Sequence, residues 1–189
     1  MQEKIIGKIA VSNRHVHLTQ EVYDQLFEEP ISLKRALNQV GEYAASQTVT
    51  LKTAKAEIPN VRVMGPCRKY NQVEISRTDA YLLGLNPPVR QSGDLKNSET
   101  ITVVGPKGEV TLENACIQAQ RHIHINEEKA QELGLKNEEK VKLVVSTDKG
   151  GIMEAFIKVS SNGFFEIHLD KDDANCFLLK TGDEVIIEK

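Results

Sequence analysis

Apolar and polar residues alternate along much of this chain with a period of two, which is typical of half-buried β-strands. Residues 101–112 and 141–159 each contain two such runs around a glycine-containing turn. This arrangement predicts two β-hairpins. Shorter runs at 49–51, 61–64 and 164–169 predict further strands. The chain is therefore expected to be mainly β.

Four short helices are expected between the strands. At four places a His or Glu is followed by one apolar residue, then by a small polar residue and a short apolar run. The small polar residues are Thr19, Ser76, Asn126 and Asp170. Thr, Ser, Asn and Asp are favoured helix N-caps, and acidic residues in the next turn suit the helix dipole. The sequence Ser76-x-x-Asp79 also resembles a capping box, with Asp in place of Glu.

The pattern indicates an internal duplication. The first half contains Arg14-His15-Val16-His17 and then Glu74, and the second contains Arg121-His122-Ile123-His124 and then His168. The fold class expected is mainly β (α+β), with two tandem small antiparallel β-barrel domains capped by short helices. The predicted domains are 1–92 and 93–189. We expect the halves to pack together with the ligand-bearing strand ends at their junction.

The composition excludes only a few classes of function. A formal charge of −3 gives no reason to expect a nucleic-acid partner. No apolar run approaches the ~18 residues of a membrane span, and the first residues lack the apolar region of a signal peptide. Three cysteines without Cys-x-x-Cys spacing fit reduced thiols in a cytoplasmic protein.

All five histidines fit the duplicated pattern, and they predict a metal site with two centres. On a strand, residues i and i+2 point to the same face, so each His-x-His pair presents two imidazoles together. Three protein ligands with an open position are usual for a catalytic zinc. The simplest partition is one metal on His15, His17 and Glu74 and one on His122, His124 and His168. Ligand exchange between the halves and other divalent transition metals remain open alternatives.

Arginines are the candidate anion ligands. Arg68 ends a Gly-Pro turn shortly before Glu74, and its fork of donors suits phosphate or carboxylate. Arg14 and Arg121 alternate to the other strand face, which favours a structural role. Cys67 is conceivable as a nucleophile, but no general base is evident beside it. No phosphate-binding glycine loop or serine-nucleophile elbow occurs in the sequence.

At these residues the chain resembles the phosphate propanoyltransferases (PduL-type phosphotransacylases). The resemblance rests on 11–18, on 64–68 with 72–79, on 120–124, and on 166–168 with Asn175. It implies tandem helix-capped barrels, two Zn²⁺ ions at a site that binds coenzyme A, and a reaction between acyl-CoA and phosphate that gives acyl phosphate and CoA. It also implies Arg68 as the catalytic phosphate ligand. Ser12, Arg62, Asn175 and Arg35 are implied as coenzyme A contacts.

The same resemblance is compatible with a homodimer. Members of the family from microcompartments carry an extra N-terminal helix for encapsulation. Here about ten residues precede the first motif, and we interpret them as a strand. We therefore expect a free cytoplasmic enzyme with acyl-CoA and phosphate as its partners.

The predicted mechanism is direct attack of phosphate on propionyl-CoA or acetyl-CoA within a ternary complex. Two readings compete with it. A metal-dependent hydrolase of thioesters or phosphoesters would use an activated water and would not need phosphate. A non-catalytic module would close the fourth metal position with protein, whereas this sequence supplies three ligands per metal.

Overall fold

The computed structural model describes residues 4–189 and consists of two compact units. The unit called here the first barrel comprises residues 14–119, and the second barrel comprises residues 120–189 together with 4–13. This division differs from the expected boundary between 92 and 93. Residues 99–119 pair with strands of the first half, and residues 5–12 pair with strands of the second half. Through these pairings, residues 99–119 belong to the first barrel and residues 5–12 to the second barrel.

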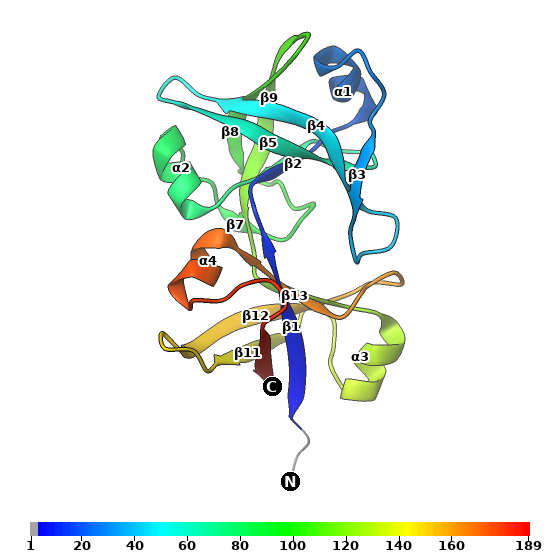
Figure 1. The fold of residues 1–189 in the computed structure, drawn as a ribbon, viewed down its shortest axis with the longest axis vertical. Coiled ribbons are helices and arrows are strands. Elements are labelled where there is room, and N and C mark those ends of the chain that lie inside the picture. The colour runs from blue at the N-terminus through cyan, green and yellow to red at the C-terminus, as the bar shows by residue number, and fades with distance from the viewer. Residues whose placement is uncertain (1–3) are drawn as a thin grey trace. The chain divides into compact units, whose positions relative to one another are not determined.

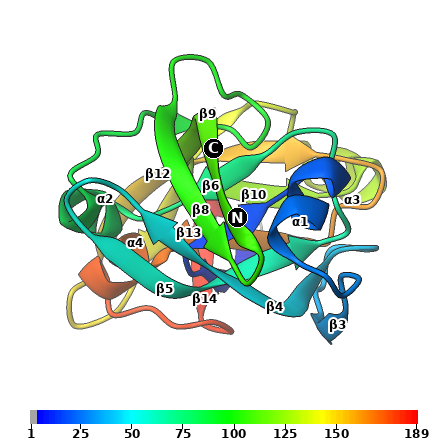
Figure 2. The same ribbon diagram turned by 90° about the horizontal axis from the view of Figure 1, so that it is seen from above.

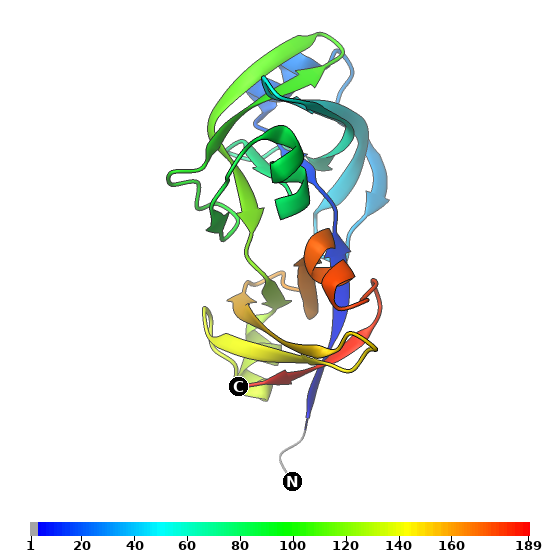
Figure 3. The ribbon, with the colours of Figure 1, turned by 90° about the vertical axis from the view of Figure 1, so that its left-hand side faces the viewer.

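The second barrel is a closed ring of six strands in the order β1, β13, β10, β12, β11, β14. Their bounds are β1 Ile5–Ser12, β10 His122–Ile125, β11 Lys140–Val145, β12 Gly151–Val159, β13 Glu166–Asp170 and β14 Glu184–Glu188. Figure 3 shows β14 in dark red in the same unit as the blue β1, with which it pairs in antiparallel register. Strand β1 confirms the strand expected before the first motif.

The first barrel is also closed by six strands. The pairings run from β4 through β5, β2, β6, β9 and β8 back to β4, and β3 and β7 add to the edges of β4 and β9. Their bounds are β2 His15–His17, β3 Leu33–Ala36, β4 Tyr43–Lys52, β5 Glu57–Gly65, β6 Gln72–Glu74, β7 Val89–Arg90, β8 Glu99–Gly105 and β9 Gly108–Ala119. Figure 2 shows the predicted β8–β9 hairpin in green.

Four short helices begin at the predicted N-caps (Figure 1). They are α1 Gln20–Leu26, α2 Arg77–Leu83, α3 Glu127–Leu133 and α4 Lys171–Cys176. The side chains of Thr19, Ser76, Asn126 and Asp170 each accept a hydrogen bond from a backbone N–H in the first turn. Ser76 and Asp79 form the expected capping box. The expectation of a mainly β protein with helix-capped barrels is confirmed.

The two barrels repeat the same strand order, with one exchange. Strands β2, β4, β5, β6, β8 and β9 correspond to β10, β11, β12, β13, β14 and β1, because equivalent pairs share the same parallel or antiparallel sense. The strand of the second barrel that corresponds to β9 is thus β1, the first strand of the chain.

Each barrel has its own apolar core. One cluster includes Val16, Leu51 and Val73, and the other includes Ile123, Leu143 and Ile167. Val16 and Ile123, the residues between the paired histidines, are 0% exposed. The alternation that buries these residues turns the flanking imidazoles to the opposite face. In residues 4–189, no helix is long and apolar enough to span a bilayer.

Candidate active site

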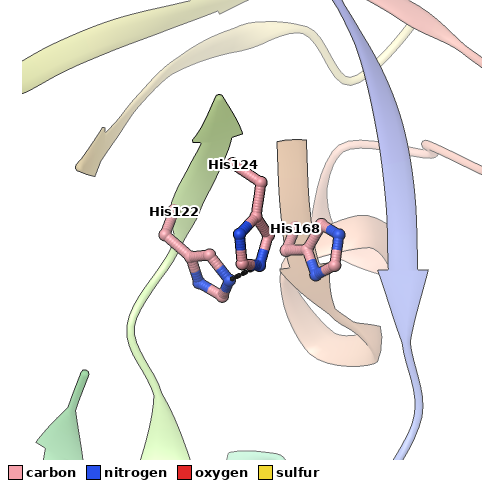
Figure 4. Close-up of side chains that lie close together, drawn as sticks. All are labelled: His122, His124 and His168. Atoms are coloured by element: carbon pink, nitrogen blue, oxygen red, sulfur yellow. Dashed lines mark hydrogen bonds between the residues drawn. The ribbon is translucent and has the colours of Figure 1, made fainter. Parts of the chain in front are cut away.

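The second barrel brings its three predicted histidine ligands together (Figure 4). His122 and His124 lie on β10, and His168 lies directly opposite His122 on β13. The Nε2 atoms of His122 and His124 are 3.1 Å apart. The Nδ1 atom of His122 lies 2.7 Å from the backbone carbonyl oxygen of Gln120, which can only accept, so Nδ1 carries the proton. Nε2 of His122 is therefore available as a ligand.

The first barrel gathers its predicted ligands in the same way. His15 and His17 lie on β2, and Glu74 on β6 is directly opposite His15. The distance from His15 Nε2 to Glu74 Oε2 is 3.4 Å. Glu74 therefore holds the strand position that His168 holds in the other barrel. The equivalence of these two residues, predicted from the repeated motif, is visible in the strand register.

The geometry of both clusters fits a transition-metal ion. Within each cluster the three ligand atoms lie within 4.8 Å of one another. Around a tetrahedral zinc with bonds of about 2.0–2.1 Å, donor atoms are separated by roughly 3.3 Å. The separations of 3.1 Å between His122 and His124 and 3.4 Å between His15 and Glu74 are near this value. Imidazole and carboxylate are also the donors that zinc uses in catalytic sites.

Arg68 lies in a network of polar side chains in the first barrel. Its Nη2 donates to Glu42 Oε1 at 2.7 Å, and its Nη1 donates to the hydroxyl groups of Tyr70 and Ser92. Ser92 Oγ also accepts from Gln72 Nε2 at 2.9 Å. Gln72 in turn donates to Glu74 Oε1 at 2.5 Å. A chain of hydrogen bonds thus links the candidate phosphate ligand to a candidate metal ligand.

Sequence reasoning assigned no role to Glu42, Gln72, Ser92 or Glu166. Glu42 and Ser92 lie in loops, and their contacts with Arg68 depend on the tertiary fold. Gln72 and Glu166 had a local signal. Each lies two residues before a predicted ligand on a strand, which places both side chains on the same face.

The arginines that precede the histidine pairs stabilise helix N-termini. Arg14 Nη1 donates to Asp79 Oδ1 at 2.8 Å, and Arg121 Nη2 donates to Asp173 Oδ1 at 2.7 Å. Asp79 and Asp173 are the third residues of α2 and α4, the helices that follow Glu74 and His168. The hydrogen bond with Asp173 raises the pKa of Arg121. These ion pairs support the structural role that the sequence favoured.

The expected coenzyme A contacts divide between the two units. Ser12 ends β1 opposite Asp170, and Asn175 lies in α4, so both belong to the second barrel. Arg62 and Arg35 belong to the first barrel. Arg62 lies opposite His15, and its Nη1 donates to the carbonyl oxygens of Ala45 and Ser46 in an irregular stretch of β4. Arg35 is exposed on the edge strand β3.

The three cysteines are free thiols in different surroundings. Burial raises the pKa of Cys116 to about 12 and also raises the pKa of Cys67. A raised pKa lowers the thiolate fraction at neutral pH. The cysteine beside Arg68 therefore lacks the environment of an activated nucleophile.

Comparisons with known proteins show the family to which the chain belongs. The family model described as phosphate propanoyltransferase matches residues 8–180. A phosphate propanoyltransferase of Thermotoga maritima is 45% identical over 95% of this chain and 87% of the relative. The Salmonella typhimurium protein of that name is 45% identical over 88% and 81%, and the Lachnoclostridium phytofermentans protein is 40% identical over 99% and 92%. The chain therefore belongs to the phosphate propanoyltransferase family of acyltransferases.

Proposed function

We propose that this protein transfers a short acyl group, propionyl or acetyl, between coenzyme A and inorganic phosphate at a site with two metal ions. One observation carries the proposal: in the first barrel, hydrogen bonds through Ser92 and Gln72 connect the guanidinium of Arg68 to Glu74. A donor group for an anion and a metal-ligand cluster are therefore parts of one polar network. The family relationship supports the choice of acyl-CoA and phosphate as substrates.

The two ligand clusters would hold the metals. His15, His17 and Glu74 form one set and His122, His124 and His168 the other. When bound, zinc supplies Lewis-acid polarisation of a carbonyl or phosphoryl oxygen. With three protein donors per cluster, a fourth position is available to substrate. We propose that both metal ions take part in the same reaction.

Arg68 would hold and orient the phosphate. Its guanidinium presents two nitrogen atoms whose present partners are a carboxylate and two hydroxyl groups. A phosphate oxygen can replace such partners with charge-assisted hydrogen bonds. Holding phosphate beside the thioester converts a collision of two molecules into an oriented reaction.

The reaction needs no covalent intermediate on the protein. A phosphate oxygen attacks the thioester carbonyl carbon, a C–O bond forms, and the C–S bond breaks as the thiolate of coenzyme A leaves. Cys67, the thiol nearest Arg68 in sequence, has a raised pKa. We therefore propose a ternary complex. Isolation of an acylated Cys67, or ping-pong kinetics, would contradict it.

The direct test is an assay of CoA release from acetyl-, propionyl- and butyryl-CoA with and without phosphate. We expect release only when phosphate or arsenate is present. Release at the same rate in phosphate-free buffer would instead identify a hydrolase. The ratio of kcat/KM values along the series would show which acyl group the pocket prefers, since one methylene is worth about 1–3 kcal/mol.

Elemental analysis tests the metal centres. The purified protein is expected to contain two transition-metal ions per chain, and His122→Ala is expected to lose one of them together with activity. Glu113→Ala is a suitable control, because Glu113 is an exposed residue on β9. Full metal content in the His122→Ala variant would refute the ligand assignment.

A further inference from the structure

Gln72 and Glu166 occupy the same place in the two barrels. Gln72 lies on β6 two residues before Glu74 and directly opposite His17. Glu166 lies on β13 two residues before His168 and directly opposite His124. Each residue therefore shares a strand face with the third candidate ligand of its cluster and is paired with the second histidine.

Gln72 and Glu166 differ in hydrogen-bonding capacity, and each complements the candidate metal ligand two residues after it. Gln72 Nε2 donates to Glu74 Oε1 at 2.5 Å. Glu166 Oε2 lies 3.1 Å from His168 Nε2 and can only accept when ionised. A carboxylate ligand thus faces an amide donor, and an imidazole ligand faces a carboxylate acceptor. Where the duplicated ligand changes from Glu to His, the residue beside it changes from Gln to Glu.

We propose that Gln72 and Glu166 are positioning residues that orient the third ligand of each metal centre and raise its affinity for the metal. The proposal rests on the metal centres of the proposed function. A ligating histidine usually donates its other N–H to a carboxylate or carbonyl, and ligating carboxylates are themselves hydrogen-bonded. The pair of Glu166 and His168 fits the first arrangement, and the pair of Gln72 and Glu74 fits the second. Only one ring nitrogen of His168 then faces the metal.

Gln72 has an additional role in the first barrel. Its side chain is 0% exposed, and its Oε1 accepts from the backbone N–H of Gly93 at 2.8 Å. This contact fixes the amide so that Nε2 is directed to Glu74 and Ser92. Because Ser92 also accepts from Arg68, Gln72 aligns the phosphate-binding arginine with the metal ligand. Variants of Gln72 should therefore raise the KM for phosphate, whereas variants of Glu166 should leave it near the wild-type value.

Metal affinity provides a readout that does not depend on turnover. We would titrate the metal-free protein, residues 1–189, with Zn²⁺ against a chromophoric chelator. Gln72→Ala and Glu166→Ala are each expected to weaken one of the two sites by about 10- to 100-fold. Gln118→Ala and Glu154→Ala are matched controls, because Gln118 binds the carbonyl of Pro87 and Glu154 pairs with Lys140. Both controls should retain wild-type affinities.

Replacing the Gln-x-Glu pair of β6 by the Glu-x-His pair of β13 distinguishes a loss of ligand positioning from a general loss of stability. Gln72→Glu alone places a second carboxylate against Glu74 and should weaken the first site. The double variant Gln72→Glu with Glu74→His recreates the Glu-x-His pair of β13 and should recover part of the lost affinity. Failure of recovery in a folded double variant would overturn the proposal for Gln72. Glu166→Gln keeps the shape of the side chain and an acceptor oxygen, so it should weaken zinc binding less than Glu166→Ala.

The outcomes also distinguish this proposal from the proposed function. If the wild-type protein binds two Zn²⁺ ions and folded Gln72→Glu and Glu166→Ala variants bind them equally well, the positioning roles are refuted and the metal centres stand. If the wild-type protein binds no Zn²⁺, both the centres and the positioning roles are refuted. Retained folding is checked by far-ultraviolet circular dichroism of each variant.

Discussion

Arg68 is the residue whose replacement should have the largest effect on turnover without removing a metal ligand. We expect Arg68→Ala to reduce kcat/KM for phosphate by about 100-fold or more, because the proposed role of Arg68 is to donate charge-assisted hydrogen bonds to the reacting phosphate. Arg68→Lys should recover only a small part, since lysine lacks the planar fork of donors. Steady-state kinetics with phosphate as the varied substrate measure both effects. Activity near the wild-type level in Arg68→Ala would remove this residue from the mechanism.

A second prediction concerns the side chain of Glu42. Its carboxylate pairs with Arg68 at 2.7 Å and is 37% exposed, so a phosphate that binds Arg68 must compete with it. A partly exposed ion pair such as this one contributes about 1 kcal/mol, which corresponds to roughly fivefold in affinity. We expect Glu42→Gln to lower the KM for phosphate by up to that factor. A raised KM would show instead that Glu42 holds Arg68 in its working position.

Thiol reactivity should follow burial. Cys176 is exposed, Cys67 is partly buried, and Cys116 is buried with a pKa raised to about 12. At pH 8 we expect a maleimide to label Cys176 first, Cys67 more slowly, and Cys116 only after denaturation, because the thiolate is the reacting form. Mass spectrometry of peptides after timed labelling measures the order. If the reaction proceeds through a ternary complex, acyl-CoA should acylate none of the three cysteines. Treatment with acyl-CoA should therefore not block their labelling by acylation.

At the level of single residues, the sequence predicted which candidate ligands lie together better than it predicted their surroundings. The clustering of the histidine pairs was predictable because the period of a strand is local, and the place of Glu74 beside them was predictable because its motif is repeated. Glu42 and Ser92 were not, since they meet Arg68 only through folding of loops that are far apart in sequence. The contact of Arg62 with coenzyme A stays a prediction; in the structure its Nη1 donates to the backbone carbonyl oxygens of Ala45 and Ser46.

At the scale of elements, equivalent ion pairs fix the starts of α2 and α4. Asp79 is 5% exposed, completes a capping box and pairs with Arg14. Asp79→Ala removes a cap contact and the carboxylate to which Arg14 Nη1 donates. We expect the free energy of unfolding to fall by about 2 kcal/mol. Asp173→Ala should cost less, because its ion pair with Arg121 is more exposed.

Urea denaturation followed by circular dichroism measures these losses. Asp148→Ala is a control, since Asp148 is exposed in the turn between β11 and β12. Equal stability of Asp79→Ala and the wild type would mean that the ion pair and the capping box contribute nothing. The helices themselves were predictable, because an N-cap side chain and the acidic turn after it act within four residues.

The pairing of strands was less predictable than their existence. Alternation identified β11 and β12 and their hairpin because both signals are local. It could not show that β2 and β10 each lie parallel to one neighbour and antiparallel to the other. Nor could it show that residues 5–12 close the second barrel, because a buried strand has the same pattern whichever sheet it joins.

In the whole molecule, the two duplicated barrels differ in where one ring strand lies in the sequence. In the first barrel, β8 and β9 form a hairpin and β9 closes the ring against β6. In the second barrel, β14 and β1 make the equivalent antiparallel pair, although they lie at opposite ends of the chain. Residues 14–119 therefore hold every strand of one ring, whereas residues 120–189 lack one strand of the other.

This difference predicts how fragments should behave. Residues 14–119 should fold alone, because all six ring strands and their core are present. Residues 120–189 should remain unfolded, since without β1 the edges of β13 and β14 lie open and Ile9 is missing from the core. Because Ile5 lies opposite Ile187, a short turn can join residue 189 to residues 4–13 and restore the missing strand as a hairpin. We expect that rearranged chain to unfold cooperatively on heating, as measured by circular dichroism. Cooperative unfolding of 120–189 alone would show that β1 is dispensable, and an unfolded rearranged chain would show that the second barrel also depends on the first.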